Sequence, residues 1–464
     1  MRATFYIYFI GLTLILSLQQ CRKNQHLTGS QYQIQTSSDT ILFDTIFTTI
    51  GSTTKQFKCY NNYNGILTIS SIHLEQETNS PYRINVDGIS GVHFENIELL
   101  PGDSIYVFVE VTIDPNGQNL PLVVEDRILF NTNGNEHQVI LNAWGQDAYF
   151  HYNDLNEGVW PNDKPHVIYG YAAVDSSKTL TILAGTKVHL HKNSLLYVYK
   201  STLNVNGQLG NEVEFLGDRL ESYYDNVSGQ YYGIYFHEAH PSTIDYAIIR
   251  NGTAGIHLYS RHLNSSSYTL TLTNSIVKNN ASYGLFVYSG AKVKAENTIV
   301  SKNGVHSVLM LEGGDLNFNH CNILGFGGSS NAAIGISNYY NHPIDNTTNV
   351  GSINECKIYN SVITGGLQSE IAIDTLSDPA INLSFDFKNC LIKSETVFQD
   401  PFYQSIVWNE DPLFENIQED DFTFSLTSNP VSPLNNNGIA SALMLDINGN
   451  PRANPPDIGV HEIN

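Results

Sequence analysis

Positive charge is scarce in this chain of 464 residues, which carries 23 Lys and Arg against 45 Asp and Glu and has a formal net charge of −22 at pH 7. No basic run is longer than Arg22-Lys23. A surface this acidic repels the phosphate backbone of nucleic acids and the anionic headgroups of lipids. We therefore expect no nucleic-acid partner and no electrostatic binding to membranes.

Charged residues of both signs are few, at 15% of the chain, while hydrophobic residues make up 41%. This hydrophobic content is too high for a disordered chain. Polarity comes instead from Asn, Ser and Thr, which compete with the helix backbone for hydrogen bonds and suit strands and turns. The composition excludes a mostly helical protein, and the length suffices for two or three domains.

Long hydrophobic runs are also missing. The one apolar segment, Phe5–Leu18, follows Arg2 and is short for a bilayer span. Cys21 comes next, and the arrangement resembles a lipoprotein signal peptide of residues 1–20, after which the Cys would be the acylated N-terminus. Gln20 departs from that pattern, which has a small residue before the Cys, and the alternative is an ordinary signal peptide beside an incidental Cys. We expect an exported outer-membrane lipoprotein, on the periplasmic or the surface side, held to the membrane by its lipid anchor only.

The other four cysteines, Cys59, Cys321, Cys356 and Cys390, show no short CxxC spacing and no His partners at zinc-ligand distances. An exported compartment would permit a disulfide, but the pattern favours four buried small apolar residues. His189-Leu190-His191 places two imidazoles on one face of a strand without an identifiable third ligand. We expect neither a metal nor a cofactor.

Residues 21–38 are polar and predict a tether, and residues 39–146 carry short strand patterns separated by turns. In one of them Tyr82, Ile84 and Val86 alternate with polar residues, which is typical of a half-buried strand. About seven such strands in about a hundred residues predict an immunoglobulin-like β-sandwich.

Three features follow one another in this region. They are the hairpin Asn64-Gly65-Ile66-Leu67-Thr68-Ile69, then Pro101-Gly102-Asp103-Ser104 before a strand, and a last strand, Val139-Ile140-Leu141, that runs into Trp144-Gly145. Their order resembles the abnormal-spindle/choice-of-anchor type of immunoglobulin-like domain, and that resemblance implies a spacer or docking module.

From residue 147 onward the sequence repeats. Asn or His, a small residue, a variable residue and an aliphatic residue recur, with the leading positions 23, 23 and 40 residues apart from Asn274 to Asn360. The larger interval predicts an insertion. The copies are Asn274-Ser275-Ile276-Val277, Asn297-Thr298-Ile299-Val300, His320-Cys321-Asn322-Ile323, Asn360-Ser361-Val362-Ile363 and Asn389-Cys390-Leu391-Ile392, with a weaker one at Tyr246-Ala247-Ile248-Ile249.

A second strand pattern keeps step with the first, at Gly255–Leu258, Gly284–Val287 and Ser307–Met310. A unit of 23 residues with several strands buries its apolar side only when copies stack. Stacked rungs about 4.8 Å apart make a parallel β-helix, in which the Asn positions form a ladder and the following small residues form one column.

Two further segments resemble secreted right-handed parallel β-helix proteins of the pectin-lyase-like fold. Leu180–Thr186 is similar to their opening rung, and the tail matches in order from Asp411. Together the matches cover residues 164–464, and the layout resembles Bacteroidetes-type β-helix repeat lipoproteins, a family largely without assigned function. We expect the β-helix over residues 147–464, with a segment from about residue 411 that covers the last rung. The tail motifs are Asp411-Pro412-Leu413-Phe414, Ser432-Pro433, Gly438, Asp446-Ile447-Asn448-Gly449-Asn450-Pro451-Arg452 and Asp457-Ile458-Gly459, and the polar set expected to pair there is Asp446, Asn448, Arg452, Asp457 and Glu462.

The motifs of polysaccharide cleavage are absent from the sequence. Asp420-Asp421 is the one adjacent Asp pair, and Gly-His-Gly and Arg-x-Lys do not occur. Cation-assisted lyases also need a basic Arg or Lys and often a calcium loop, and no Asp-x-Asp-x-Asp-Gly loop is present. These absences favour a protein without catalysis.

The segment from Asp218 to Tyr232 interrupts the rungs and is rich in Tyr. Tyr rings stack on sugar faces and their hydroxyl groups form hydrogen bonds, so this loop is a candidate glycan site. The alternative, which we favour, is a flap packed on the flank of the coil. The candidate ligand-binding residues are Asp218, Arg219, Tyr223, Tyr224, Tyr231, Tyr232, Tyr235 and His237.

The sequence thus predicts a monomeric cell-envelope lipoprotein whose β-helix binds a polysaccharide or a cell-envelope protein on a lateral face, without catalysis. One alternative is a polysaccharide lyase or glycoside hydrolase of pectin-lyase-like fold. Another is a structural stalk or adhesin.

Overall fold

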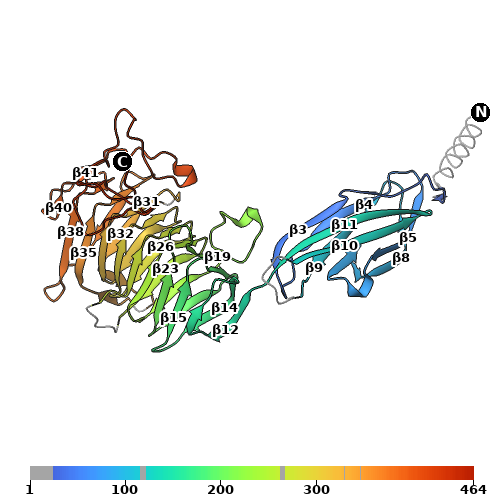
Figure 1. The fold of residues 1–464 in the computed structure, drawn as a ribbon, viewed down its shortest axis with the longest axis horizontal. Coiled ribbons are helices and arrows are strands. Elements are labelled where there is room, and N and C mark those ends of the chain that lie inside the picture. Colours follow the sequence, from blue (N-terminus) through green and yellow to red (C-terminus); the bar gives the residue numbers. More distant parts are fainter. Residues whose placement is uncertain (1–24, 115–121, 262–266, 329, 345, 464) are drawn as a thin grey trace, which may run out of the picture. The chain divides into compact units, whose positions relative to one another are not determined.

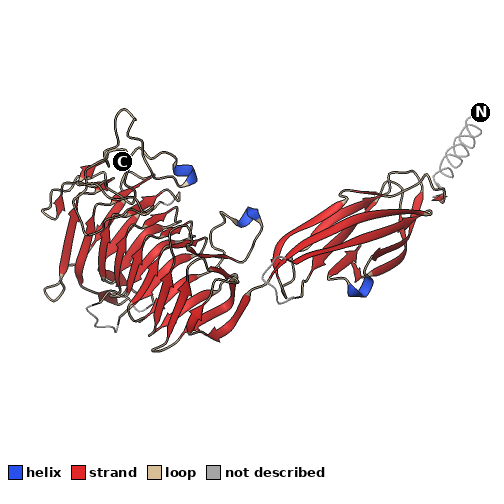
Figure 2. Cartoon of the chain, viewed as in Figure 1, coloured by secondary structure: helices blue, strands red, loops and turns tan. Residues whose placement is uncertain are grey.

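A computed structural model describes residues 25–114, 122–261, 267–328, 330–344 and 346–463 (Figure 1). Cys21 and the expected signal peptide lie outside these residues. The chain forms two compact units, Met1–Asp147 and Ala148–Asn464. Both consist almost entirely of strands (Figure 2). In the part of the chain that is described, no helix is long and apolar enough to cross a membrane.

The first unit is a sandwich of two sheets around an apolar core that includes Phe43, Tyr82 and Phe130. Strand β6 (Tyr82–Val86) shows the predicted alternation of buried and more exposed residues. One sheet contains β1 (His26–Leu27), β5 (Ile66–Leu74), β10 (Leu122–Thr132), β11 (Asn135–Gln146) and β3 (Thr40–Phe47) in this order, with β8 (His93–Leu99) on β5; the other contains β2 (Gln35–Thr36), β4 (Lys55–Tyr60), β9 (Ser104–Val111), β6 and β7 (Ile89–Gly91).

The expected tether, residues 21–38, is corrected by the structure over its described part. Strand β1 pairs with β5 and β2 pairs with β4, so both belong to the sandwich. Two apolar residues explain this pairing, although their neighbours are polar. Ile34 is buried in the core of the sandwich, and Leu27 packs against that core.

The second unit is a parallel β-helix in which each full rung contributes one strand to each of three faces. The polar face contains β13 (Gly158–Trp160), β15 (Thr179–Leu183), β18 (Thr202–Asn206), β21 (Ser242–Asp245), β24 (Leu270–Thr273), β27 (Lys292–Glu296), β30 (Asp315–Asn319), β35 (Ile353–Tyr359), β38 (Leu383–Lys388) and β40 (Tyr403–Gln404).

The two other faces join through the long first strands β12 (Tyr149–Leu155) and β14 (His166–Val174). The covered face continues with β16 (Lys187–Leu190), β19 (Val213–Gly217), β22 (Ala247–Arg250), β25 (Ile276–Lys278), β28 (Ile299–Ser301), β31 (Asn322–Gly325), β36 (Val362–Gly365), β39 (Leu391–Ile392) and β41 (Val407–Trp408). The aromatic face continues with β17 (Leu195–Tyr199), β20 (Gly233–His237), β23 (Ala254–Tyr259), β26 (Tyr283–Tyr288), β29 (His306–Leu311), β32 (Ile334–Ser337) and β37 (Ile371–Asp374).

The repeated Asn marks the turn from the polar face to the covered face. Asn274, Asn297 and Asn360 all have φ of 49°, and His320 has φ of 53°. Asn tolerates this left-handed region better than most residues, which explains its recurrence. The predicted ladder is present, since Asn297 Nδ2 donates to Asn274 Oδ1 over 2.9 Å.

The small residue after each Asn or His points into the coil. Ser275, Thr298, Cys321, Ser361 and Cys390 are all buried. In successive rungs the Ser361 hydroxyl accepts the backbone N–H of Cys321 over 3.0 Å. All four described cysteines are free thiols in buried positions, as the sequence predicts.

The insertion predicted between His320 and Asn360 contains the hairpin of β33 (Tyr339–Asn341) and β34 (Thr348–Val350). It follows β32 and therefore leaves the coil at the edge of the aromatic face. The edge of the Tyr340 ring meets Tyr288 at 6.2 Å between centroids and 88° between planes.

The C-terminal segment packs along the covered face, which corrects its expected place over the last rung. Ile299, Leu324 and Val362 point outward from this face. They form one apolar cluster with Phe422, Phe424, Leu434, Ile447, Ile458 and Val460 of the segment. Because the outer side of these strands is apolar, covering it with the C-terminal segment removes apolar surface from water.

The polar residues at the C-terminus pair with one another, but against the flank. Arg452 and Glu462 have side chains only 3% and 1% exposed and lie 3.5 Å apart. Arg452 also donates to Asn297 Oδ1 over 2.7 Å, and Asp446 Oδ2 accepts the backbone N–H of Glu462 over 2.9 Å. These contacts attach the segment to the Asn ladder.

Candidate functional site

The predicted Tyr-rich loop leaves the coil after β19, and its charged residues are satisfied within the protein. Asp218 Oδ2 lies 2.7 Å from His191 Nδ1. The guanidinium of Arg219 donates two hydrogen bonds to Glu221, at 3.1 and 2.8 Å, and lies 4.2 Å from the centre of the Tyr224 ring. These contacts stabilise the loop and leave little charge for a ligand.

The four Tyr of the loop occupy different environments and do not form one surface. Tyr223 is 78% exposed and meets Tyr224 edge to face. Tyr231 is 1% exposed and lies inside the coil, where its hydroxyl donates to the carbonyl oxygen of Arg250 over 2.9 Å. Tyr232 points to the outer side, and its hydroxyl lies 2.9 Å from His257 Nδ1. Neighbouring strand residues point to opposite faces, which separates Tyr231 from Tyr232.

Tyr235 and His237 lie on the outer side of β20, where they belong to a larger array. Each of four consecutive strands, β17, β20, β23 and β26, places two ring-bearing residues outward, one residue apart. We call this set the aromatic ladder. Its first column contains Tyr197, Tyr235, His257 and Phe286, and its second column contains Tyr199, His237, Tyr259 and Tyr288.

The ladder was not predicted from the sequence, although the sequence carries a signal for it. An aromatic or His residue, an apolar residue and a second aromatic or His residue recur once per rung. Within a strand the outer positions are two residues apart, so this pattern indicates two outward columns. The copies are Tyr197-Val198-Tyr199, Tyr235-Phe236-His237, His257-Leu258-Tyr259 and Phe286-Val287-Tyr288.

Within the ladder most rings pack against rings of the next rung. Tyr235 and His257 have centroids 4.3 Å apart and planes 14° apart, and the centroids of His257 and Phe286 are 4.7 Å apart. Such contacts cover the faces of these rings. Burial lowers the pKa of His257 to about 4, so this ring is neutral at pH 7 and stacks as an uncharged aromatic group.

The first column ends at Tyr197, because the register places Ala173 of β14 beside it. A methyl group leaves a hollow where the other rungs place a ring. We call this hollow the aromatic groove; its volume is about 460 Å³. It is lined by Leu155, Tyr171, Ala173, Asp175, Leu195, Tyr197, Tyr199 and Tyr235.

Two rings of the groove are held in a common orientation. The planes of Tyr197 and Tyr199 are 8° apart and their centroids 6.1 Å apart. The Tyr197 hydroxyl lies 2.6 Å from His237 Nδ1. Burial and the neighbouring Tyr199 and Asp175 raise the pKa of Tyr197, so its phenol is protonated at neutral pH. Contacts from β20 thus fix a ring that borders open space.

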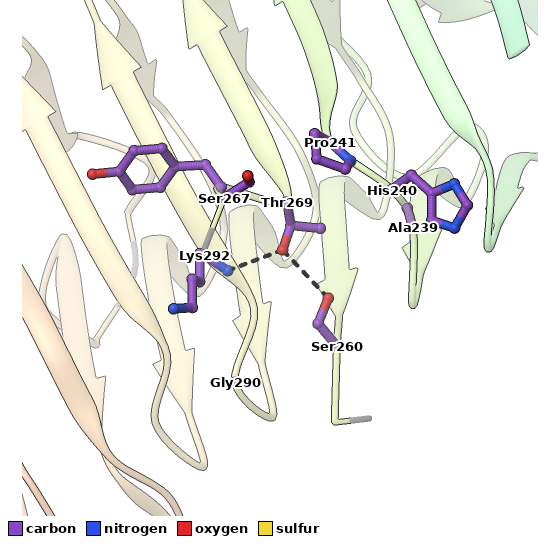
Figure 3. Close-up of a pocket in the computed structure, with 9 residues that line it drawn as sticks. Ala239, His240, Pro241, Ser260, Ser267, Thr269, Gly290 and Lys292 are labelled. Atoms are coloured by element: carbon purple, nitrogen blue, oxygen red, sulfur yellow. Dashed lines mark hydrogen bonds between the residues drawn. The ribbon is translucent and has the colours of Figure 1, made fainter. Parts of the chain in front are cut away.

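Two other cavities are less suited to a ligand. A hollow of about 90 Å³ lies at the corner between the aromatic and polar faces. Thr269 Oγ1 lies there 3.2 Å from the backbone nitrogen of Lys292 and 3.4 Å from Ser260 Oγ, the two contacts dashed in Figure 3. The hollow has room for little more than water.

A larger polar cleft of about 560 Å³ lies between the loop and the C-terminal segment. Lys278 and Lys302 each contact Asp420 at 2.6 Å. Burial opposes ionisation of Asp420, but the two lysines hold its pKa below the usual range. Its carboxylate is therefore ionised and paired with both lysines. Such a group can hold the C-terminal segment against the coil, but it has no proton to donate as a general acid.

Metal-ligating side chains do not gather in groups of three or more anywhere in the described ranges. His189 is 5% exposed, and its Nδ1 lies 2.9 Å from the carbonyl oxygen of Gly217. His191 is exposed and bonded to Asp218, so the two imidazoles of this strand have separate partners.

Comparison with protein-family models finds a match in the second unit. Residues 185–323 match the family described as a right handed beta helix region. Together with the stacked parallel strands, this match defines the second unit as a right-handed parallel β-helix. No curated protein matches the chain.

Three solved structures are similar to parts of the chain, each over 26% of its length. They are a family 123 glycoside hydrolase from Clostridium perfringens (6% identity, TM-score 0.19), the ASH/PapD-like domain 7 of human CEP192 (12%, 0.17) and the VesB protease of Vibrio cholerae (12%, 0.18). The matches cover 30%, 89% and 33% of those chains. Scores this low carry no argument about fold or function.

Proposed function

We propose that the β-helix binds an extended glycan on its aromatic face and that the aromatic groove holds one of the sugar units. The parallel rings of Tyr197 and Tyr199, beside the hollow left by Ala173, carry this proposal. Sugar rings present C–H groups that pack on aromatic faces, and phenol hydroxyl groups supply the hydrogen bonds.

The dimensions of the face support an extended ligand. Rungs repeat at about 4.8 Å, which is close to the length of one sugar unit in a β-linked chain. A glycan that runs along the coil would therefore meet a new pair of ladder residues at each unit. Tyr340, at the far end of the second column, would limit its length.

A binding role is better supported than catalysis. Glycoside hydrolysis uses two carboxyl groups that flank the scissile bond. Asp175 is the one acidic side chain among the described residues that line the groove. We therefore propose a non-enzymatic glycan-binding protein, with the N-terminal sandwich as an immunoglobulin-like spacer.

The binding proposal predicts a loss of affinity in the double variant Y197A/Y199A. Two stacking rings contribute about 0.5–1.5 kcal/mol each beyond their burial, so affinity for a bound oligosaccharide should fall about tenfold to a hundredfold. Isothermal titration of the purified protein with cellohexaose, xylohexaose, mannohexaose and chitohexaose measures this. Y152A/Y223A, which removes two exposed rings outside the groove, is the control. Saturable binding that Y197A/Y199A leaves intact would place the site elsewhere.

We also propose that Cys21 is lipidated and that the protein is an outer-membrane lipoprotein. Expression of the wild type and of Cys21→Ala in an exporting host, followed by detergent phase partitioning, tests this. Only the wild type should enter the detergent phase. Equal partitioning into the aqueous phase would mean that the Cys is incidental.

A further inference from the structure

We propose that the aromatic groove selects an uncharged glycan over a polyuronate, and that Asp175 is the residue that discriminates between them. This inference rests on the proposed glycan-binding function. It concerns the charge of the ligand, which the ring contacts alone do not determine.

Asp175 follows directly after β14 and lines the groove with Tyr197 and Tyr199. Its Oδ1 accepts the backbone N–H of Ser176 over 2.7 Å and the Ser176 hydroxyl over 3.2 Å. These bonds orient the exposed carboxylate and leave Oδ2 free to accept a hydrogen bond from a sugar hydroxyl. A carboxylate is a stronger acceptor than a neutral group.

Two lysines close to the groove, Lys200 and Lys178, pair with other carboxylates. Lys200 lies 3.5 Å from Glu238, whose side chain is only 8% exposed, and 5.1 Å from the centre of the Tyr199 ring. Lys178 lies 2.7 Å from Glu157. Among the described residues, no Lys or Arg forms an ion pair with Asp175. The carboxylate of Asp175 is therefore not neutralised by an ion pair with any described residue.

The histidines of the ladder do not supply a cation either. Burial lowers the pKa of both His237 and His257, so both rings are neutral at pH 7. At the far end of the face, Arg261 and Glu312 form an ion pair 3.0 Å apart.

A polyuronate would bring one carboxylate per sugar unit into this environment. Its charge would be repelled by Asp175, and Lys200, which lies over the Tyr199 ring, already pairs with Glu238. A neutral chain has no such cost and can donate hydroxyl groups to the carboxylate. The repulsion is comparable in size to one stacking contact and acts on each uronate unit within reach of Asp175, so the discrimination should be about tenfold or more at low salt.

Titrations of the full-length protein with neutral hexaoses and with hexagalacturonate, at two salt concentrations, test the inference. The wild type should bind a neutral hexaose at least about tenfold more tightly than hexagalacturonate. Asp175→Asn should weaken neutral binding several-fold, and Asp175→Lys should strengthen hexagalacturonate binding by about tenfold at low salt, an effect that salt removes. Asp378→Asn, an exposed Asp outside the groove lining, is the control.

The outcomes separate the two proposals. If hexagalacturonate binds as tightly as any neutral chain and Y197A/Y199A abolishes that binding, the glycan site stands and the assignment of an uncharged ligand is wrong. If Asp175→Lys changes neither ligand, Asp175 does not discriminate. If no hexaose of either kind binds saturably, the glycan-binding function itself fails.

Discussion

Tyr231→Ala is expected to destabilise the β-helix by about 3–5 kcal/mol, which is typical of removing a large aromatic side chain from a core. The Tyr231 ring is 1% exposed among the apolar residues of the coil. Its hydroxyl also donates to the carbonyl oxygens of Phe215 and Arg250 over 3.2 and 2.9 Å, and these acceptors would lose a partner. The midpoint of thermal or guanidinium unfolding measures the effect.

Tyr223→Ala is the matched control from the same loop. Its side chain is 78% exposed, so the free energy of unfolding should change by no more than about 0.5 kcal/mol. Tyr231→Phe keeps the ring and should fall between the two. Equally small effects of Tyr231→Ala and Tyr223→Ala would contradict the burial of the Tyr231 ring inside the coil.

Arg452→Met is expected to release the C-terminal segment from the covered face. Removing one partner of a buried ion pair costs about 3–5 kcal/mol, because the remaining charge stays buried without compensation. Here the carboxylate of Glu462, with Asp446 and Asp457 close by, would lose its cation. Asn297 Oδ1 would also lose the guanidinium as its donor.

Limited proteolysis and the unfolding midpoint together measure this release. The variant should become sensitive to cleavage between residues 411 and 464 at temperatures where the wild type is resistant. Arg127→Met is the control, because it removes a half-exposed ion pair with Glu75. It should change the free energy of unfolding by no more than about 1 kcal/mol. An Arg452→Met protein as resistant as the wild type would contradict the buried pairing.

The rungs could be predicted from the sequence because their signals are local. Asn297 occupies a left-handed turn that few other residues accept, and the following Thr298 and Ile299 take set positions in the rung. Each copy of the repeat has the same residue types at these positions, so the same geometry recurs. The ladder and the burial of Cys321 and Cys390 in one column therefore followed from the spacing of the repeat.

The place of the C-terminal segment could not be predicted in the same way. Arg452 meets Asn297 across 155 residues of sequence, and no periodicity connects them. An indirect signal was present in Ile299, Leu324 and Val362, outward positions of the covered face that are apolar where a solvated strand would be polar. Such positions indicate that something covers them but do not identify it.

The candidate site was located only in part, for a related reason. A cluster of Tyr in a short loop looks like one surface, but Tyr231 and Tyr232 point to opposite sides of the coil wall. Tyr197 and Tyr235 lie side by side in adjacent rungs although they are 38 positions apart in the sequence, so no local cluster reveals their contact. The groove itself exists because Ala173 is small, which is apparent only once the register is known.

The structure of the protein with a bound neutral hexaose, one that the titrations show to bind, tests the central claim most directly. We expect a sugar ring against Tyr197 and Tyr199, a hydroxyl group within hydrogen-bond distance of Asp175, and the chain running along the coil across β17 and β20. A hexaose bound instead at the loop around Tyr223, or in the polar cleft beside Asp420, would contradict the account.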